Sequence, residues 1–211
     1  MVLKKSGFPY WLVHPVSLAP ALWIGMQWFT NSLGANPIQA VTQWTGRFAV
    51  VWLLLTLTCT PLHLLGEPHA RKFRKPLGLY TFMYAALHLL SFVILDYRLQ
   101  IGFIIKNLPY QTFIIPGLLG FLILLAMALT SNRWSIRKLK GRWNTLHRFI
   151  YLAGAAILIH AYWARKFDRR LIIVFIVIFT ILMVFRIPSL QKWLRQKKKE
   201  RKTAKSKTYP A

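Results

Sequence analysis

Apolar residues in this chain are grouped in long runs that are separated by short polar segments. Runs of about 17–25 apolar residues are typical of helices that cross a bilayer, whose hydrocarbon core is about 30 Å thick. The pattern predicts six such helices, at residues 10–29, 46–65, 77–95, 113–130, 143–163 and 171–187. Pro15 and Pro20 lie in the first run, where they indicate a bend. Because the connections are short, we expect an all-α integral membrane bundle of six transmembrane helices.

The chain divides into two regions of different composition. We expect residues 1–190 to form one transmembrane domain and residues 191–211 to form a basic cytoplasmic tail. The tail predicts attraction to anionic membrane lipids, at about 1 kcal/mol per basic residue near the surface. Docking of a soluble partner on the tail is the alternative. The first run lacks a small-residue cleavage site, so we expect it to remain as a helix rather than to be removed as a signal peptide.

The composition agrees with a membrane protein, because 55% of the residues are hydrophobic and only 16% are charged. The formal net charge of +25 would suggest nucleic-acid binding in a soluble domain. Here the basic residues lie between the apolar runs and in the tail, so no nucleic-acid partner is expected. A single cysteine, Cys59, excludes an internal disulfide and a cysteine-ligated cluster within one chain.

Most of the basic residues fall in every second connecting segment. Lysine and arginine are enriched in the cytoplasmic loops of membrane proteins. The pattern therefore predicts a multi-pass membrane protein with both termini in the cytoplasm. Besides the tail, the side predicted to be cytoplasmic holds Lys4, Lys5, Arg71, Lys72, Arg74, Lys75, Arg133, Arg137, Lys138, Lys140, Arg142 and Arg186. The opposite side holds Arg47, Arg98, Lys106, Arg165, Lys166, Arg169 and Arg170.

Three histidines, His88, His147 and His160, lie within the apolar runs. Ionisable side chains are costly in hydrocarbon, so they mark a functional site by default. Imidazole is a common metal ligand and an axial ligand of haem iron. The four acidic residues lie in loops or in the tail, which argues against a proton pathway, a transporter or an ion channel. We therefore expect the histidines to ligate haem.

The distance of each histidine from the basic segments indicates its depth in the membrane. His88 and His160 are both expected in the outer half, on helices that run in the same direction. They are predicted to face each other and to ligate one haem b from its two sides. His147 is expected near the cytoplasmic face, about 20 Å from His160 on one helix at about 1.5 Å per residue. These two histidines therefore do not easily share one metal.

The sequence leaves the partner of His147 open. His63, near the cytoplasmic end of the second run, and His14, near the start of the first, are at a suitable depth for a second ligand or a quinone contact. A five-coordinate haem, or contact of His147 with a quinone or a flavin, is the alternative. Arg47 is either a contact for the propionates of the outer haem or an arginine that extends to the membrane interface.

Several motifs resemble the ferric-reductase-like transmembrane family, whose six-helix core carries haem-ligating histidines on its third and fifth helices. They are residues 12–20 with His14, TGRF at 45–48, RKPLGL at 74–79, LHL at 87–89, GRWNTLHRFIYL at 141–152, and His160. The resemblance covers nearly the whole chain. It implies that His88, His147 and His160 ligate one or two haems b, with haem iron as the only metal. The fourth intrahelical histidine of the family's oxidases is replaced here by Arg74.

The same resemblance implies a non-catalytic electron-transfer subunit of an oxidoreductase complex. Family members of this type take electrons from the quinone pool or a cytoplasmic flavin reductase, and some carry FMN. They pass the electrons to a periplasmic molybdopterin-containing reductase subunit that repairs methionine sulfoxide in oxidised periplasmic proteins. No G-x-G-x-x-G motif occurs, so we expect no nicotinamide-binding domain. Another ferric-reductase-like electron carrier and a cofactor-free structural membrane subunit remain as alternatives.

Overall fold

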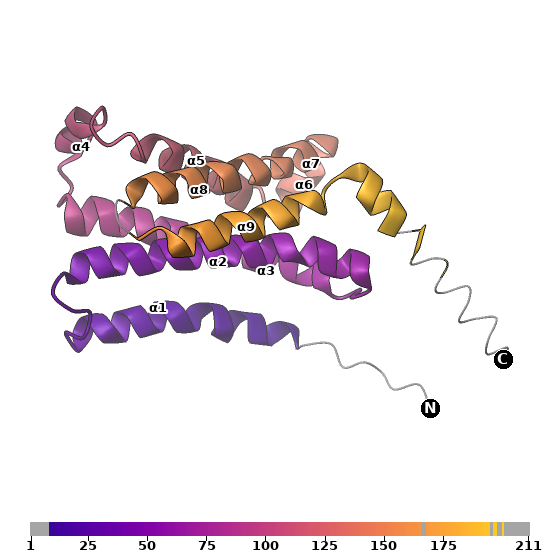
Figure 1. Ribbon diagram of the computed structural model, residues 1–211, viewed down its shortest axis with the longest axis horizontal. Coiled ribbons are helices and arrows are strands. Elements are labelled where there is room, and N and C mark those ends of the chain that lie inside the picture. The colour runs from indigo at the N-terminus through magenta and orange to yellow at the C-terminus, as the bar shows by residue number, and fades with distance from the viewer. Residues whose placement is uncertain (1–8, 166–167, 195, 198–199, 201–211) are drawn as a thin grey trace.

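The computed structural model describes residues 9–165, 168–194, 196–197 and 200. Every regular element within these residues is a helix, which confirms the predicted all-α fold. The long helices lie side by side along one axis and alternate in direction (Figure 1). They are α1 (Val13–Phe29), α2 (Pro37–Leu65), α3 (Ala70–Leu90), α5 (Ile114–Leu129), α8 (Ile150–Ala164) and α9 (Arg170–Val184). Each of the six predicted runs overlaps one of these long helices, and the fifth run also includes the shorter α7 (Gly141–Arg148).

The second helix begins earlier than the apolar pattern predicts, at Pro37 rather than at residue 46. Asn36 caps it, because its side chain accepts a hydrogen bond from the amide of Gln39 at 3.0 Å. Proline at the first helical position loses no hydrogen bond, since that amide has no partner within the helix. The added turns carry polar side chains, which is why a search for apolar runs does not include them.

The fifth predicted run forms two helices rather than one. α7 (Gly141–Arg148) and α8 are separated by Phe149. The amide of Phe149 donates to the carbonyl of Leu146 at 3.1 Å, which is the tighter hydrogen bond of a 3₁₀ turn. His147 and His160 therefore do not share one continuous helix. The expectation of one continuous helix was wrong, while the estimate of about 20 Å between the two histidines stays a prediction.

Two of the described helical segments are long and apolar enough to cross a membrane. One is α2, and the other is Ala70–Asp96, in which α3 continues as the π-helix η2 (Ser91–Asp96). The number of candidate membrane spans rises to four if each of two bent helix pairs is counted as one span. These are α5 with α6 (Arg133–Leu139), bent by 98°, and α9 with Pro188–Leu194, bent by 68°. Six transmembrane helices and cytoplasmic termini stay predictions.

One end of the bundle gathers the segments that were predicted to be cytoplasmic. The start of α1, the junction of α2 and α3, the region of α6 and α7, and the end of α9 lie there (Figure 1). These segments hold Arg71, Lys72, Arg74, Lys75, Arg133, Arg137, Lys138, Lys140, Arg142 and Arg186. Lys4, Lys5 and most of the basic tail lie outside the described residues. At the opposite end, α4 (Ile101–Asn107) connects α3 to α5.

A tyrosine of α3 completes the hydrogen bonding of α1 beside Pro20. Tyr84 is fully buried. Its hydroxyl accepts a hydrogen bond from the amide of Ala21 at 3.0 Å and donates one to the carbonyl of Ser17 at 2.7 Å. In a regular helix these two backbone groups would bond each other. The hydroxyl therefore inserts into α1 next to Pro20 and links α1 to α3. Tyr84 lies one turn before His88 on α3.

Candidate functional site

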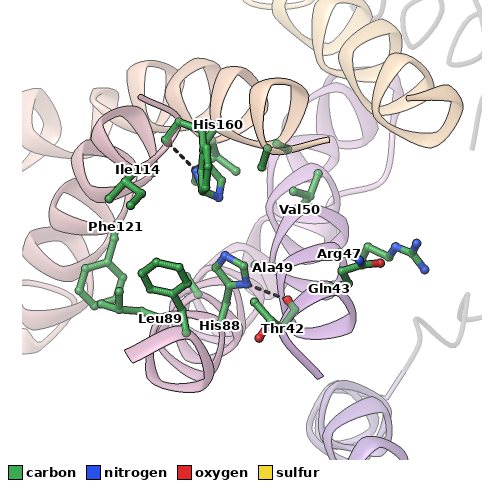
Figure 2. Close-up of a pocket in the computed structure, with 18 of the residues that line it drawn as sticks. Thr42, Gln43, Arg47, Ala49, Val50, His88, Leu89, Ile114, Phe121 and His160 are labelled. Carbon is green, nitrogen blue, oxygen red and sulfur yellow. Dashed lines mark hydrogen bonds between the residues drawn. The ribbon is translucent and has the colours of Figure 1, made fainter. Parts of the chain in front are cut away.

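A cavity of about 480 Å³ lies between α2, α3, α5 and α8, with α9 contributing to its wall. This volume falls in the range of cofactor pockets, roughly 300–1,000 Å³. Most of the wall is apolar: Ala49, Val50, Ala85, Leu89, Phe121, Leu124, Ile157 and Phe175. His88 from α3 and His160 from α8 also line the cavity, and their rings point toward each other across it (Figure 2).

The ring of His88 is held from behind by α2. Its Nδ1 donates a hydrogen bond to the carbonyl of Thr42 at 2.8 Å. Because a carbonyl can only accept, Nδ1 carries the ring proton and Nε2 keeps its lone pair. Metal-ligating histidines are commonly oriented in this way, through a hydrogen bond from the other ring nitrogen. α2 can approach this closely because it has glycine at position 46, where a Cβ would lie 3.0 Å from Nδ1.

The ring of His160 is held by α5 in the same manner. Its Nδ1 donates to the carbonyl of Phe113 at 2.7 Å, so its Nε2 also keeps a lone pair. Gly117 lies against the ring, and a Cβ at that position would lie 2.5 Å from Nδ1. Each histidine is therefore held in one orientation, and in its neutral form it has Nε2 left for a ligand.

The spacing of the two rings fits a shared metal. Their centroids are 5.8 Å apart and their planes are inclined by 79°. An imidazole nitrogen binds a transition metal at about 2 Å and lies about 1 Å from its ring centre, so two rings on one metal have centres about 6 Å apart. The residues present thus fit the axial ligation of a haem iron. The structure brings His88 and His160 together at one level, while ligation itself stays a prediction.

His147 lies apart from this cavity, on α7 at the other end of the bundle. Its Nδ1 donates to the carbonyl of Trp143 in its own helix at 3.1 Å, and its ring stacks on that indole with centroids 3.9 Å apart. Its Nε2 is 3.5 Å from the hydroxyl of Ser131. Within the described residues, no group of three or more His, Cys, Asp or Glu side chains is arranged to hold a metal. The role of His147 as a haem ligand stays a prediction.

His14 and His63, the predicted partners of His147, are also absent from the wall of the cavity. His14 is exposed on α1, and its Nδ1 forms a hydrogen bond of 3.0 Å with the hydroxyl of Tyr80. His63 is half-buried in the last turn of α2. A second ligand or a quinone contact at either histidine stays a prediction.

Polar side chains gather at one rim of the cavity. Arg47 is among them, but its side chain extends from the far side of α2, away from the rings (Figure 2). Its guanidinium carbon lies 4.7 Å from the ring centroid of Trp44. Arg165 lines the same cavity and donates a hydrogen bond to Gln43 at 3.2 Å. The sequence assigned Arg165 only to the outer side of the membrane, although its position shortly after His160 could have suggested a contact with the site.

Known proteins resemble this chain over more than half of its length. Residues 45–159 match the family described as ferric reductase like transmembrane component, and this stretch includes His88 and ends just before His160. The chain is also similar to two proteins named "Protein-methionine-sulfoxide reductase heme-binding subunit MsrQ". The one from Brucella anthropi is 36% identical over 158 residues, which cover 75% of this chain and 72% of that protein. The one from Brucella ovis is 33% identical over 195 residues, which cover 92% and 88%. The chain therefore belongs to the ferric reductase like transmembrane component family, and these MsrQ subunits are its relatives.

Proposed function

We propose that this chain is a membrane-embedded haem b subunit that transfers electrons, with His88 and His160 as the two axial ligands of one haem. One observation carries the proposal: two imidazoles face each other across an apolar cavity, and each donates its Nδ1 proton to a backbone carbonyl. The MsrQ relatives, which are named as heme-binding subunits, support the same cofactor.

The chain's own residues would bind, orient and insulate this group. A bound haem supplies the one-electron redox couple. The carbonyls of Thr42 and Phe113 fix which nitrogen of each ring is free, so the ligands need little rearrangement. The apolar part of the wall would limit the access of water to a group held between the rings, and this low polarity would tune the potential of its metal.

We also propose that Arg47 and Arg165 at the polar rim contact the two propionates. A guanidinium group matches a carboxylate with two parallel hydrogen bonds. The Nε of Arg47 is buried and has no hydrogen-bond partner among the described residues, so it has the capacity to donate one. Arg47 and Arg165 both line the cavity and both carry a positive charge, which favours carboxylates at its rim.

This assignment predicts a change in potential. Replacing Arg47 and Arg165 together by glutamine should lower the midpoint potential of the haem, because nearby positive charge favours the reduced form. The expected drop is up to about 60 mV, which is about a tenfold change in a one-electron equilibrium. Redox titration followed by absorbance measures it. Lys106→Gln, which removes an exposed positive charge on α4 at the same end of the bundle, is the control and should leave the potential nearly unchanged.

We further propose that the electrons come from the quinone pool or a cytoplasmic flavin reductase. They would leave to a periplasmic molybdopterin-containing methionine sulfoxide reductase subunit, across the bacterial inner membrane. The names of the relatives support the link to methionine sulfoxide reduction. The apolar helices support a membrane location. A second haem at His147, an FMN, and a quinone contact near His14 or His63 stay predictions.

Absorption spectra of the purified full chain, before and after dithionite, test the cofactor. We expect a Soret band, and visible bands that sharpen on reduction as they do for a low-spin haem with two imidazole ligands. A protein expressed with ample haem and still lacking a Soret band would contradict the proposal and favour a cofactor-free structural subunit.

Mixing experiments test the partner. Under anaerobic conditions, the molybdopterin-containing subunit and a peptide with methionine sulfoxide should together reoxidise the haem of the reduced chain. Omission of either the subunit or the peptide should prevent this. A haem that stays reduced in the complete mixture would overturn the proposed partner and leave the cofactor assignment intact.

A further inference from the structure

The two histidines are held by one local arrangement that the fold builds twice. In each copy, a histidine Nδ1 donates to a carbonyl on the neighbouring helix, and a glycine one turn after that carbonyl lies against the ring. The sequence separations between the hydrogen-bonded residues are nearly equal, 46 and 47. The two sets are Thr42, Gly46 and His88, and Phe113, Gly117 and His160.

Each glycine leaves room that the imidazole ring occupies. A Cβ on Gly117 would lie 2.5 Å from Nδ1 and 2.9 Å from Cε1 of His160. Unbonded heavy atoms prefer separations of about 3.5–4.0 Å, so the ring would have to move. A Cβ on Gly46 would lie 3.0 and 3.2 Å from the same atoms of His88. The displacement forced on the ring is therefore larger at Gly117 than at Gly46.

We propose that Gly46 and Gly117 are positioning residues that set the ring planes of the two histidines. The near-perpendicular arrangement of the rings, 79° between their planes, depends on both glycines. A ring that turns away from an added methyl group also turns its Nδ1 away from the carbonyl, so steric contact and hydrogen bond fix the same orientation. This inference rests on the proposed haem function.

The angle between the ligand planes has a spectroscopic signature. A low-spin ferric haem with two imidazole ligands in perpendicular planes gives an electron paramagnetic resonance signal with a large highest g value. Parallel planes give a rhombic signal with a smaller highest g value. We expect the signal of the native chain to be of the first type, and the glycine variants to move toward the second.

Gly117→Ala and Gly46→Ala in the full-length chain test the proposal. Gly117→Ala should lose the large-g signal and hold haem roughly 10–100-fold less tightly, the usual cost of disturbing the outer partner of a ligating histidine. Gly46→Ala should retain its haem and shift the highest g value in the same direction by less. If Gly117→Ala fails to accumulate, the milder Gly46→Ala still decides the question.

Gly120→Ala is the matched control, because it crowds the same pair of helices without touching a histidine. Its Cβ would lie 2.7 Å from a side-chain carbon of Ile157. It should lower thermal stability and leave the g values unchanged. Gly25→Ala, whose Cβ would meet no described atom of another element within 4 Å, should also leave the g values unchanged.

The outcomes separate this inference from the proposed function. A native chain without haem contradicts the proposed function. A native chain that holds haem, with Gly46→Ala and Gly117→Ala variants that keep its signal, contradicts only the positioning role of the glycines. A shift of the g values in Gly120→Ala as large as that in Gly117→Ala also overturns the inference, because it would show that general crowding of the helices is sufficient.

Discussion

Replacing His160 by alanine should empty the proposed haem site, and replacing His88 should do the same. In the proposed site each ring would supply one of the two ligands of the iron, so either change would leave one side of the iron without a protein nitrogen. Disturbing only the outer partner of a ligating histidine costs about 10–100-fold in metal affinity, and loss of the ligand itself should cost more. Haem per chain, measured after purification, should fall to the background level in both variants.

Three further measurements make this result specific. His69→Ala, at an exposed position preceding α3, should keep its haem. His147→Ala should keep the haem between His88 and His160, because His147 lies outside their cavity. Added imidazole should restore a low-spin spectrum to His160→Ala, since it can occupy the space that the side chain leaves, and a misfolded chain would not respond. Full low-spin spectra in both His88→Ala and His160→Ala would contradict the ligand assignment.

The helices could be located from the sequence because a hydrophobic run reports directly on an apolar environment. Their ends were harder to locate. The first turns of α2 contain polar residues, so a search for apolar runs does not find the start of this helix. Asn36 and Pro37 are the residues that mark it. The break at Phe149 has no proline or glycine beside it to mark it. It arises from a single tight turn, which the apolar pattern of 143–163 does not record.

The sequence could predict that His88 and His160 lie at the same depth along the bundle, because this depth follows from the number of residues between each histidine and the nearest basic segments. What holds their rings could not be predicted in this way. The carbonyls of Thr42 and Phe113 have no sequence signature, because every residue carries one. Glycines 46 and 117 acquire their role from a ring on another helix, and only packing in three dimensions shows which glycine meets which ring.

Removing the hydroxyl of Tyr84 should be among the most destabilising small changes in this chain. Tyr84→Phe leaves the amide of Ala21 and the carbonyl of Ser17 without their partner, and each buried orphan costs about 1–3 kcal/mol. Pro20, between them, hinders the local straightening that would let them bond each other. We expect the free energy of unfolding to fall by about 2–4 kcal/mol, measured by denaturant titration in detergent.

Tyr80→Phe is the matched control, because it removes the same atom from the same helix one turn earlier. The hydroxyl of Tyr80 bonds the exposed His14 rather than two backbone groups, so its loss should change stability by no more than about 0.5 kcal/mol. If both variants lost the same free energy of unfolding, the insertion of the Tyr84 hydroxyl into α1 would not be a specific source of stability. Tyr84→Phe should also leave the g values of bound haem unchanged, because the hydrogen bond of His88 to α2 does not involve α1. The two readouts together separate the attachment of α1 from the positioning of the ligand.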